Sequence, residues 1–318
     1  MALYLSLHKS GELKNRAAIF SKHLSNCELC PHKCKVNRLN GELGICGAKA
    51  AVRIHSYQLH FGEEPAISGN NGSGTIFFSY CSGRCIYCQN WRFSQAGEGR
   101  DLYEKELSRL MLDLQNMGAH NINLVTPAHF LPQIIQAVCM AAESGLNIPI
   151  VYNTSGYERV EILKLLEGIV DIYLPDLRYF NDDFGLKFSG FPEYGRINRE
   201  AIKEMYRQVG NLEIDNGIAK KGLLIRHLIL PKNISDIDKV LQFIAAEISQ
   251  DSFVSLMSQY HPFYRANEEP LLNRPISRKE YQDALNAIHE AGLSNGWIQE
   301  DVDEETRRKF AGENFKSL

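Results

Sequence analysis

Three cysteines in the first third of the chain stand at a spacing that suits an iron–sulfur cluster. Cys81, Cys85 and Cys88 form a C-x3-C-x2-C motif directly after an apolar stretch. Three thiolates can hold three corners of a 4Fe–4S cluster and leave the fourth iron without a protein ligand. An iron that remains open can bind a small molecule, so the motif favours a catalytic cluster over an electron relay. The alternative is a structural zinc loop, although zinc sites usually pair two C-x2-C-like knuckles.

A second group of cysteines precedes the first. Cys27, Cys30, Cys34 and Cys46 form a C-x2-C-x3-C-x11-C pattern in a segment with little predicted secondary structure. Four soft ligands close either a zinc site or a second iron–sulfur cluster, and the pattern does not choose between these metals. His32, inside this group, is either a substitute ligand or a solvent-facing side chain. Because four thiolates complete the coordination, we expect this site to be structural or electron-carrying rather than catalytic.

The composition indicates a protein with a sizeable packed core. Of its 318 residues, 44% are hydrophobic and 23% are charged, which suits one large α/β-barrel domain with a small appendage. A net charge of −3 gives no support to a broad basic face, so we expect no nucleic-acid partner. Residues 1–20 contain no continuous apolar run, so we expect neither a signal peptide nor a membrane span. Eight cysteines without a secretory signal indicate reduced, metal-binding thiols in the cytoplasm.

Strands and helices alternate along the chain after residue 74. Apolar runs predict strands at 75–80, 121–126, 149–153, 171–175, 223–230 and 253–257. Helical spacing of apolar residues predicts helices at 101–117, 132–142, 158–167, 197–209, 235–248 and 277–291. This alternation predicts βαβ units and a parallel sheet, and a full eight-stranded barrel would take about 250 residues. The predicted fold is α/β: a cysteine-rich metal-binding extension at 1–70, a partial (β/α)6 TIM-type barrel at 71–300 and a C-terminal tail at 301–318.

Polar side chains follow several predicted strands, at the end where parallel barrels carry their active sites. Asp176 and Arg178 offer a carboxylate and a guanidinium at one barrel mouth, which suits a zwitterionic ligand. Asn153 and Thr154 end the preceding strand, and Thr154 is either a ligand contact or a helix cap. Arg226 lies within an apolar strand, where an unpaired charge is costly, so we expect it to bind a ligand carboxylate.

The three-cysteine motif, with Tyr87 directly before its last cysteine, resembles the signature of the radical S-adenosylmethionine (SAM) superfamily. Further segments look like barrel motifs of pyruvate formate-lyase activating enzymes, namely residues 88–90, 153–156, 176–178 and 225–231. With the cysteine-rich segment before the barrel, the chain most resembles an uncharacterised branch of proteins similar to these enzymes. The resemblance covers residues 27–265.

The resemblance implies a 4Fe–4S cluster on the three-cysteine motif and SAM as the second cofactor. The open iron of such enzymes chelates the amino and carboxylate groups of SAM, and an electron from the cluster splits a carbon–sulfur bond to give a 5′-deoxyadenosyl radical. Thr154 and Asp176 match positions that hold a cation beside the SAM carboxylate in activating enzymes, whereas Asn153 stands where those enzymes carry Asp. The implied electron donor is a flavodoxin or a ferredoxin.

Several reactions are compatible with this resemblance. The most familiar is activation of a glycyl-radical enzyme by hydrogen abstraction from a protein glycine, which implies a protein substrate. The alternatives are radical modification of a small molecule or another polypeptide, and a non-catalytic iron–sulfur electron-transfer protein. One segment departs from the superfamily pattern, because residues 124–129 replace the Gly-Gly-Glu motif that binds the SAM amine. No sequence feature specifies the substrate.

Overall fold

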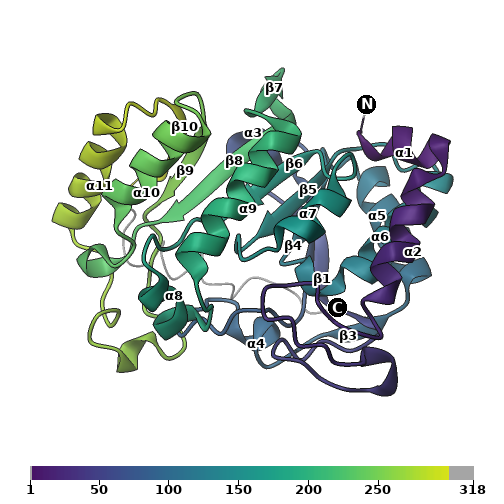
Figure 1. Cartoon of the computed structure of the whole chain (residues 1–318). Helices are drawn as coiled ribbons and strands as arrows, with labels where there is room; N and C mark the ends of the chain where they lie inside the picture. Colours follow the sequence, from purple (N-terminus) through teal and green to yellow (C-terminus); the bar gives the residue numbers. More distant parts are fainter. Residues whose placement is uncertain (1, 301–318) are drawn as a thin grey trace.

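A ten-stranded sheet runs through residues 2–300, the part of the chain that the structure, a computed structural model, describes (Figure 1). Its strands are β1 (Val52–His60), β2 (Ser73–Phe78), β3 (Arg100–Leu102), β4 (Ile122–Val125), β5 (Ile150–Thr154), β6 (Ile172–Pro175), β7 (Glu213–Asp215), β8 (Ile218–Leu228), β9 (Phe253–Met257) and β10 (Asn295–Ile298). The α-helices are α1 (Tyr4–Ser10), α2 (Glu12–Lys22), α3 (Pro65–Ser68), α4 (Trp91–Ser94), α5 (Glu104–Asn116), α6 (Leu131–Glu143), α7 (Val160–Leu166), α8 (Asp182–Ser189), α9 (Tyr194–Val209), α10 (Ile237–Phe243) and α11 (Arg278–Glu290).

The strand order is that of a partial barrel. Along the sheet it reads β10-β9-β8-β6-β5-β4-β2-β1-β3, with β7 paired to β8. From β2 to β9, six neighbouring strands are parallel, and β10 continues them beside β9. The predicted α/β fold with a partial (β/α)6 barrel is therefore confirmed. The predicted tail at 301–318 lies outside the described residues.

The predicted elements recur with small shifts at their ends. All six predicted strands are present, and β2 is buried along its whole length, as expected for a parallel strand covered on both faces. The helix predicted at 101–117 begins later, at Glu104, because residues 100–102 pair with β1 as β3. The helix predicted at 277–291 is α11, where the Ser277 hydroxyl accepts the Glu280 amide and the Glu280 carboxylate accepts the Ser277 amide.

The sheet begins inside the segment predicted to form the extension. β1 pairs antiparallel with β2, so it continues the sheet beyond the first barrel strand. Before it, α1 and α2 pack against α6 on the outside of the barrel (Figure 1). The Leu3 amide donates to the Asp171 carboxylate at 2.7 Å, and the Arg16 guanidinium donates to the Leu165 carbonyl at 2.8 Å. These contacts attach the N-terminal helices to the barrel and hold the cysteine-rich loop that follows them.

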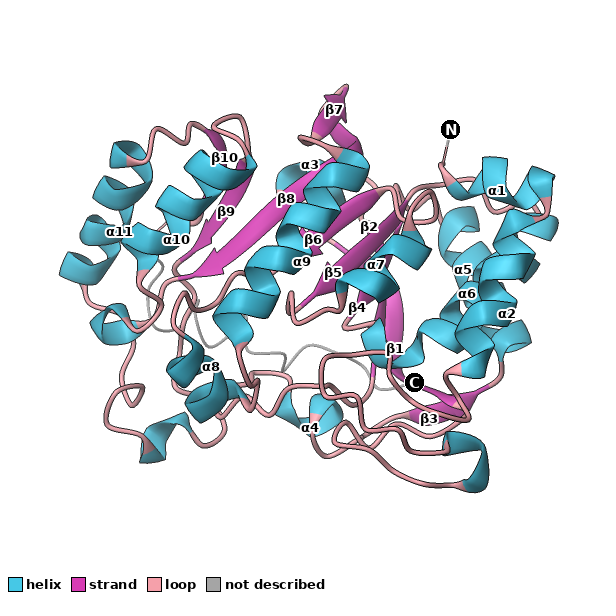
Figure 2. Cartoon of the chain, in the orientation of Figure 1, coloured by secondary structure: helices cyan, strands magenta, loops and turns pink. Residues whose placement is uncertain are grey.

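The two faces of the sheet are covered differently. One face packs into the main core with α5, α6, α7 and α9, while α3 covers the other face, which we call the inner face (Figure 2). There Ala66 and Ile67 of α3 contact a second apolar cluster that includes Val151, Leu174 and Leu224. On each strand, the side chain two residues after one of these apolar residues also lies on the inner face and is nearer to the carboxyl end of the strand. In residues 2–300, no helix combines the length and the apolar character needed to cross a bilayer.

Candidate functional site

The three-cysteine motif lies on a loop that leaves the carboxyl end of β2. Tyr80 starts this loop with a φ of 69°, and its amide donates to the Phe93 carbonyl at 2.8 Å. The Gln95 side-chain amide donates to the Cys85 carbonyl at 2.9 Å. These bonds attach the loop to α4 and thereby fix the segment that begins with Cys81 and ends with Cys88.

Each sulfur of the motif has one polar contact of its own. The Gly83 amide donates to the Cys81 sulfur at 3.2 Å, and the Ser94 hydroxyl lies 3.2 Å from the Cys88 sulfur. The Arg178 guanidinium donates to the Cys85 sulfur at 2.9 Å. Such donors stabilise thiolate ligands and tune the potential of an iron–sulfur cluster. The donor set therefore fits a cluster with three protein ligands.

The environment of the Cys81 and Cys88 thiols favours their protonated form as long as no metal is bound. All eight cysteines are free thiols. Burial raises the pKa of Cys81 to about 12 and that of Cys88 to about 11, with the neighbouring Cys85 sulfur adding to both shifts. Because metal ligands must be deprotonated, iron binding at this loop has to release protons.

Asp176 and Arg178 lie beside the cysteine loop. The Arg178 Nε and Nη2 donate to the same Asp176 oxygen at 3.0 and 2.6 Å, while Nη1 contacts the Cys85 sulfur. The two side chains are 22% and 23% exposed, so the pair is partly shielded and still open to a ligand. The structure thus brings the predicted pair to the motif, and their contact with a ligand remains a prediction.

Asn153 and Thr154 point to opposite faces at the end of β5. Asn153 is the register partner of Leu174 and lies on the inner face, near the carboxyl end of the barrel. The Thr154 hydroxyl, on the outer face, donates to the Glu158 carboxylate and accepts the Gly156 amide at 3.2 Å. The Thr154 side chain is therefore engaged in a local turn and does not cap α7, whose N-cap is Arg159, so a ligand contact of Thr154 stays a prediction.

Gly156 lets the β5 loop pack closely on the end of β6. Its φ is +72°, and a Cβ at this position would lie 2.0 Å from the Asn198 Nδ2 and 2.5 Å from the Asp176 carbonyl oxygen. The Asn198 amide in turn donates to that carbonyl at 2.9 Å. Only glycine fits here, and this packing holds the backbone of Asp176 in place.

Arg226 is paired with carboxylates of the protein itself. The expectation of a ligand carboxylate rested on Arg226 being unpaired, and this reason was wrong. Its Nε and Nη2 donate to the two Glu64 oxygens at 2.8 and 2.6 Å, and Nη2 also contacts the Glu63 carboxylate. A buried guanidinium needs a counter-ion, and the chain supplies two. The sequence pattern missed both glutamates because they lie more than 160 residues away, in a polar stretch before α3.

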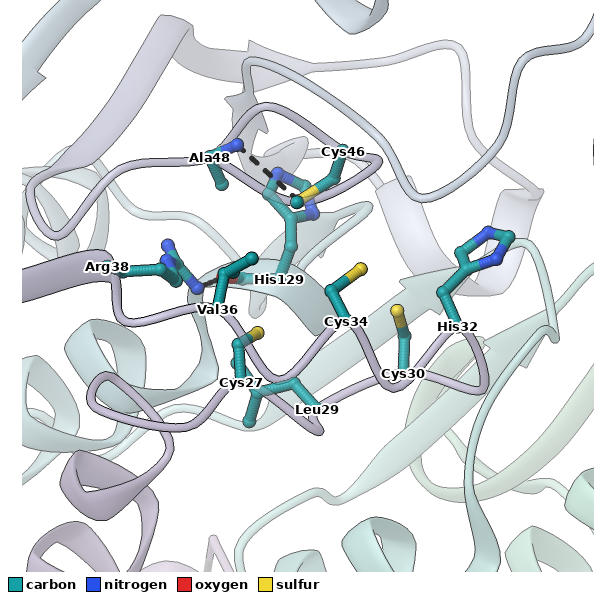
Figure 3. A pocket seen from close by; sticks show the side chains of 11 residues that line it. Cys27, Leu29, Cys30, His32, Cys34, Val36, Arg38, Cys46, Ala48 and His129 are labelled. Carbon is teal, nitrogen blue, oxygen red and sulfur yellow. Dashed lines mark hydrogen bonds between the residues drawn. The ribbon is translucent and has the colours of Figure 1, made fainter. Parts of the chain in front are cut away.

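The second group of cysteines lines one cavity. Figure 3 shows the sulfurs of Cys27, Cys30, Cys34 and Cys46 around a common space, which Leu29, Val36, Ala48 and His129 also line. The Ile45 amide lies 3.5 Å from the Cys34 sulfur, and the Ala48 amide lies 3.4 Å from the Cys46 sulfur. Within residues 2–300, no three Cys, His, Asp or Glu side chains are grouped so that they could hold a metal ion.

His32 takes no place among these sulfurs. It lines the edge of the cavity, beyond Cys30 in Figure 3, but its Nε2 lies 2.9 Å from the Ser82 carbonyl oxygen and must donate to it. His129 is buried and neutral, since burial lowers its pKa to about 3, and its Nε2 donates to the Ser79 carbonyl at 2.8 Å. Neither histidine is needed as a ligand.

The two cysteine groups lie on adjacent loops. Ser82, the partner of His32, follows Cys81 directly, and the Arg84 guanidinium of the same loop contacts the Ile45 carbonyl next to Cys46. The four-cysteine segment is therefore docked on the loop that carries the three-cysteine motif.

The sequence of the chain is similar to that of known proteins. The model of the radical SAM superfamily matches residues 75–244. Two relatives come from Methanocaldococcus jannaschii: the uncharacterized protein MJ0674 is 30% identical over 90% of this chain and 80% of its own length, and the uncharacterized protein MJ0808 is 23% identical over 89% and 84%.

Two solved structures have a low similarity to this chain. Methylornithine synthase (PylB) is 14% identical, with a TM-score of 0.48 over 99% of this chain and 82% of its own. SuiB of Streptococcus suis, bound to S-adenosylmethionine, is 11% identical, with a TM-score of 0.49 over 70% of this chain and 48% of its own. Since the family model spans more than half of its residues, the chain belongs to the radical SAM superfamily.

Proposed function

We propose that this protein is an enzyme that cleaves SAM reductively at a 4Fe–4S cluster held by Cys81, Cys85 and Cys88. Membership of the radical SAM superfamily supports SAM cleavage by radical chemistry. The observation that carries the ligand assignment is the loop itself, where each of three neighbouring sulfurs has its own polar contact. A cluster bound there supplies the electron for cleavage, at a potential tuned by hydrogen bonds to its sulfurs.

The Asp176–Arg178 pair is the proposed receptor for the amino-acid end of SAM. A guanidinium carries five N–H donors, and its contacts with Asp176 and Cys85 use three of them. The remaining donors suit the carboxylate of SAM, and the Asp176 carboxylate suits its ammonium group. Asn153, on the inner face beside them, adds a side-chain amide. This arrangement supports an amine contact that does not depend on a Gly-Gly-Glu motif.

The four N-terminal cysteines are proposed to hold a second iron–sulfur cluster rather than zinc. Zinc draws four sulfurs to about 2.3 Å from one centre. The four sulfurs of this site surround one shared cavity, and a 4Fe–4S cluster takes four cysteine ligands. A cubane gives each cysteine its own iron and therefore suits a wider spacing. Because the segment is docked on the loop of the catalytic motif, an electron-carrying role fits this site.

The proposed substrate is taken from the resemblance to pyruvate formate-lyase activating enzymes. Activation of a glycyl-radical enzyme, by hydrogen abstraction from a protein glycine, is the version that the resemblance favours, with a flavodoxin or ferredoxin as electron donor. Radical modification of a small molecule or of another polypeptide is the second version. Fold and family do not determine the substrate, so each version depends on the chemistry of the barrel interior.

Replacement of one motif cysteine tests the proposed reaction. The anaerobically reconstituted protein, reduced with dithionite, should release 5′-deoxyadenosine from SAM, and Cys85→Ala should abolish the release. Cys139→Ala is the matched control, because Cys139 is a buried thiol on α6, away from both cysteine groups. Full SAM cleavage by the Cys85 variant would refute the ligand assignment. A cluster whose spectrum does not respond to SAM would instead support a non-catalytic electron-transfer protein.

Metal analysis tests the second site separately. In a variant with Cys81, Cys85 and Cys88 all replaced by Ala, the N-terminal site alone should retain about four iron atoms per chain. A single zinc atom would refute the second cluster and indicate a structural zinc site. A further Cys34→Ala replacement should remove the remaining iron.

A further inference from the structure

A group of charged and polar side chains lies inside the barrel, apart from both cysteine groups. We call Glu63, Glu64, Asn123 and Arg226 the floor cluster. The two glutamates directly precede α3, Asn123 is on β4 and Arg226 is on β8. Arg226 contacts both carboxylates, and the Asn123 Nδ2 donates to the Glu63 Oε1 at 3.0 Å. Elements far apart in the sequence thus meet in one hydrogen-bonded group.

The floor cluster is buried and carries a surplus negative charge. The side chains of Glu63, Glu64 and Arg226 are 7%, 6% and 13% exposed, and Asn123 has no exposed surface. Two carboxylates face one guanidinium, and among residues 2–300 no lysine or second arginine forms an ion pair with either glutamate. An uncompensated buried charge is costly, so the cluster lacks one positive charge.

An unpaired acceptor in the same group points to a missing partner. The Asn123 Oδ1 is buried and has no hydrogen-bond partner, although the other atom of its amide is held by Glu63. Buried polar atoms almost always find a partner. An unpaired oxygen beside a surplus carboxylate suits a group that both donates hydrogen bonds and carries positive charge.

The floor cluster lies on the same face of the sheet as the proposed SAM site. Leu174 and Leu224 pack against α3 on the inner face, so Asp176 and Arg226, two residues further along β6 and β8, share that face. Asp176 and Arg226 are bridge partners on these neighbouring strands.

Neighbouring polar side chains lead from the cysteine motif to the floor cluster. The Cys85 sulfur accepts a bond from Arg178, and Arg178 is paired with Asp176. Asp176 lies beside Arg226, which holds Glu63 and Glu64. The floor cluster is therefore related to the cysteine motif through the Asp176–Arg178 pair and through Arg226, the strand neighbour of Asp176.

We propose that the floor cluster binds a protonated primary amine of the substrate. Glu64 and Arg226 neutralise each other through two hydrogen bonds, which leaves Glu63 as the surplus charge. An ammonium group donates to the Glu63 carboxylate and to the Asn123 Oδ1, and it supplies the missing positive charge. The substrate class is an amine-bearing compound or a lysine side chain of a polypeptide. The inference rests on the proposed function only in assigning this amine to the substrate.

The test uses butylammonium chloride as the probe, with sodium butyrate and 1-butanol as anionic and neutral analogues. The chain is labelled with 13C at the methionine methyl groups, and the Met257 signal is assigned with a Met257→Leu variant. Met257 is two residues beyond Ser255, the register partner of Arg226, so its side chain lies on the inner face. We expect a saturable shift of the Met257 signal with butylammonium at millimolar concentration and no such shift with butyrate or butanol.

Glu63→Gln removes the surplus charge while it keeps the shape of the side chain and the Glu64–Arg226 pair. We expect it to weaken butylammonium binding at least tenfold. Glu213→Gln, at the exposed strand β7, is the matched control and should bind like the wild type. Equal binding by the Glu63 variant, or a Met257 shift as large with butanol, would overturn the proposal.

The two proposals fail separately. The butylammonium titration reports binding whether or not SAM is cleaved, and 5′-deoxyadenosine release by the wild type is measured without an amine. A protein that binds butylammonium and never cleaves SAM would refute the proposed function alone. If the Glu63 variant does not fold, the comparison of the three probes on the wild-type Met257 signal still decides the inference.

Discussion

The guanidinium of Arg178 contacts a proposed cluster ligand directly, and its removal should lower the reduction potential of the cluster. Arg178 donates to the Cys85 sulfur at 2.9 Å and is held in place by two bonds to Asp176. The reduced cluster carries one more negative charge than the oxidised one, so a cation on its sulfur favours reduction. Arg178→Met removes this contact and leaves the Asp176 carboxylate without its counter-ion. Both changes disfavour the reduced state.

The size of this effect follows from the energy of one charged hydrogen bond. Such a bond contributes about 1.5–3 kcal/mol. For a one-electron couple, a tenfold change in the equilibrium constant corresponds to about 59 mV. If the whole bond energy favours the reduced state, the midpoint potential of the Arg178→Met variant should fall by at most about 65–130 mV. The side chain is only 23% exposed, so solvent screens little of this interaction.

An anaerobic redox titration followed by electron paramagnetic resonance measures this shift. Both proteins should also carry Cys34→Ala with the three-cysteine motif intact, so that the N-terminal cluster is removed and only one signal is present. Arg196→Met is the matched control, because Arg196 forms exposed ion pairs on α9. A midpoint that stays at the wild-type value, or that rises, would refute the contribution of Arg178 to the cluster environment.

Two further predictions concern stability. Gly156→Ala should lower the free energy of unfolding in urea by about 2–4 kcal/mol, because the new Cβ would meet Asn198 and the Asp176 carbonyl. Gly217 has a similar φ of +80° but lies in open space, so Gly217→Ala should lower it by only about 1 kcal/mol. Equal losses in the two variants would contradict the close packing at Gly156. Burial lowers the pKa of His227 from its ordinary value of 6.5 to about 4, so the folded state resists its protonation, and its contribution to stability is complete above pH 6.5 and declines as the pH falls toward 4. His227→Gln should therefore lose about 2 kcal/mol less than the wild type between pH 7 and pH 5, and an equal loss would show that His227 does not cause the acid sensitivity.

The sequence pattern predicted the parallel barrel because its strands are local apolar runs. Each central strand is buried on both faces and therefore reads as a short hydrophobic segment between helices. The strands at the two ends of the sheet are different, since β1 is held by pairing with β2 and β3, and β10 by pairing with β9. Their own residues carry a weak signal, so tertiary pairing decides that they join the sheet.

The helices at the N-terminus were missed for a related reason. α2 buries only a narrow stripe of Leu13, Ala17 and Phe20 against the barrel, and its remaining side chains are polar. A short helix of this kind is stabilised by packing rather than by its own propensity. Its position on α6 becomes visible only when the barrel is folded.

What the sequence alone determined is the chemistry that depends on local spacing. Three thiols within eight residues must lie close together in any fold, so the iron–sulfur motif could be read directly from the chain. The pairing of Asp176 with Arg178 is likewise local, because only one residue separates them at the end of one strand.

What only the tertiary structure decided is which distant charges meet inside the barrel. Arg226 could be recognised as a buried charge that needs an anion, but Glu63 and Glu64 reach it from a loop more than 160 residues earlier. The same holds for the docking of the four-cysteine segment on the loop of the catalytic motif. Electrostatic pairing depends on the distance between the charges in space and on their burial, and the order of residues along the chain specifies neither of these.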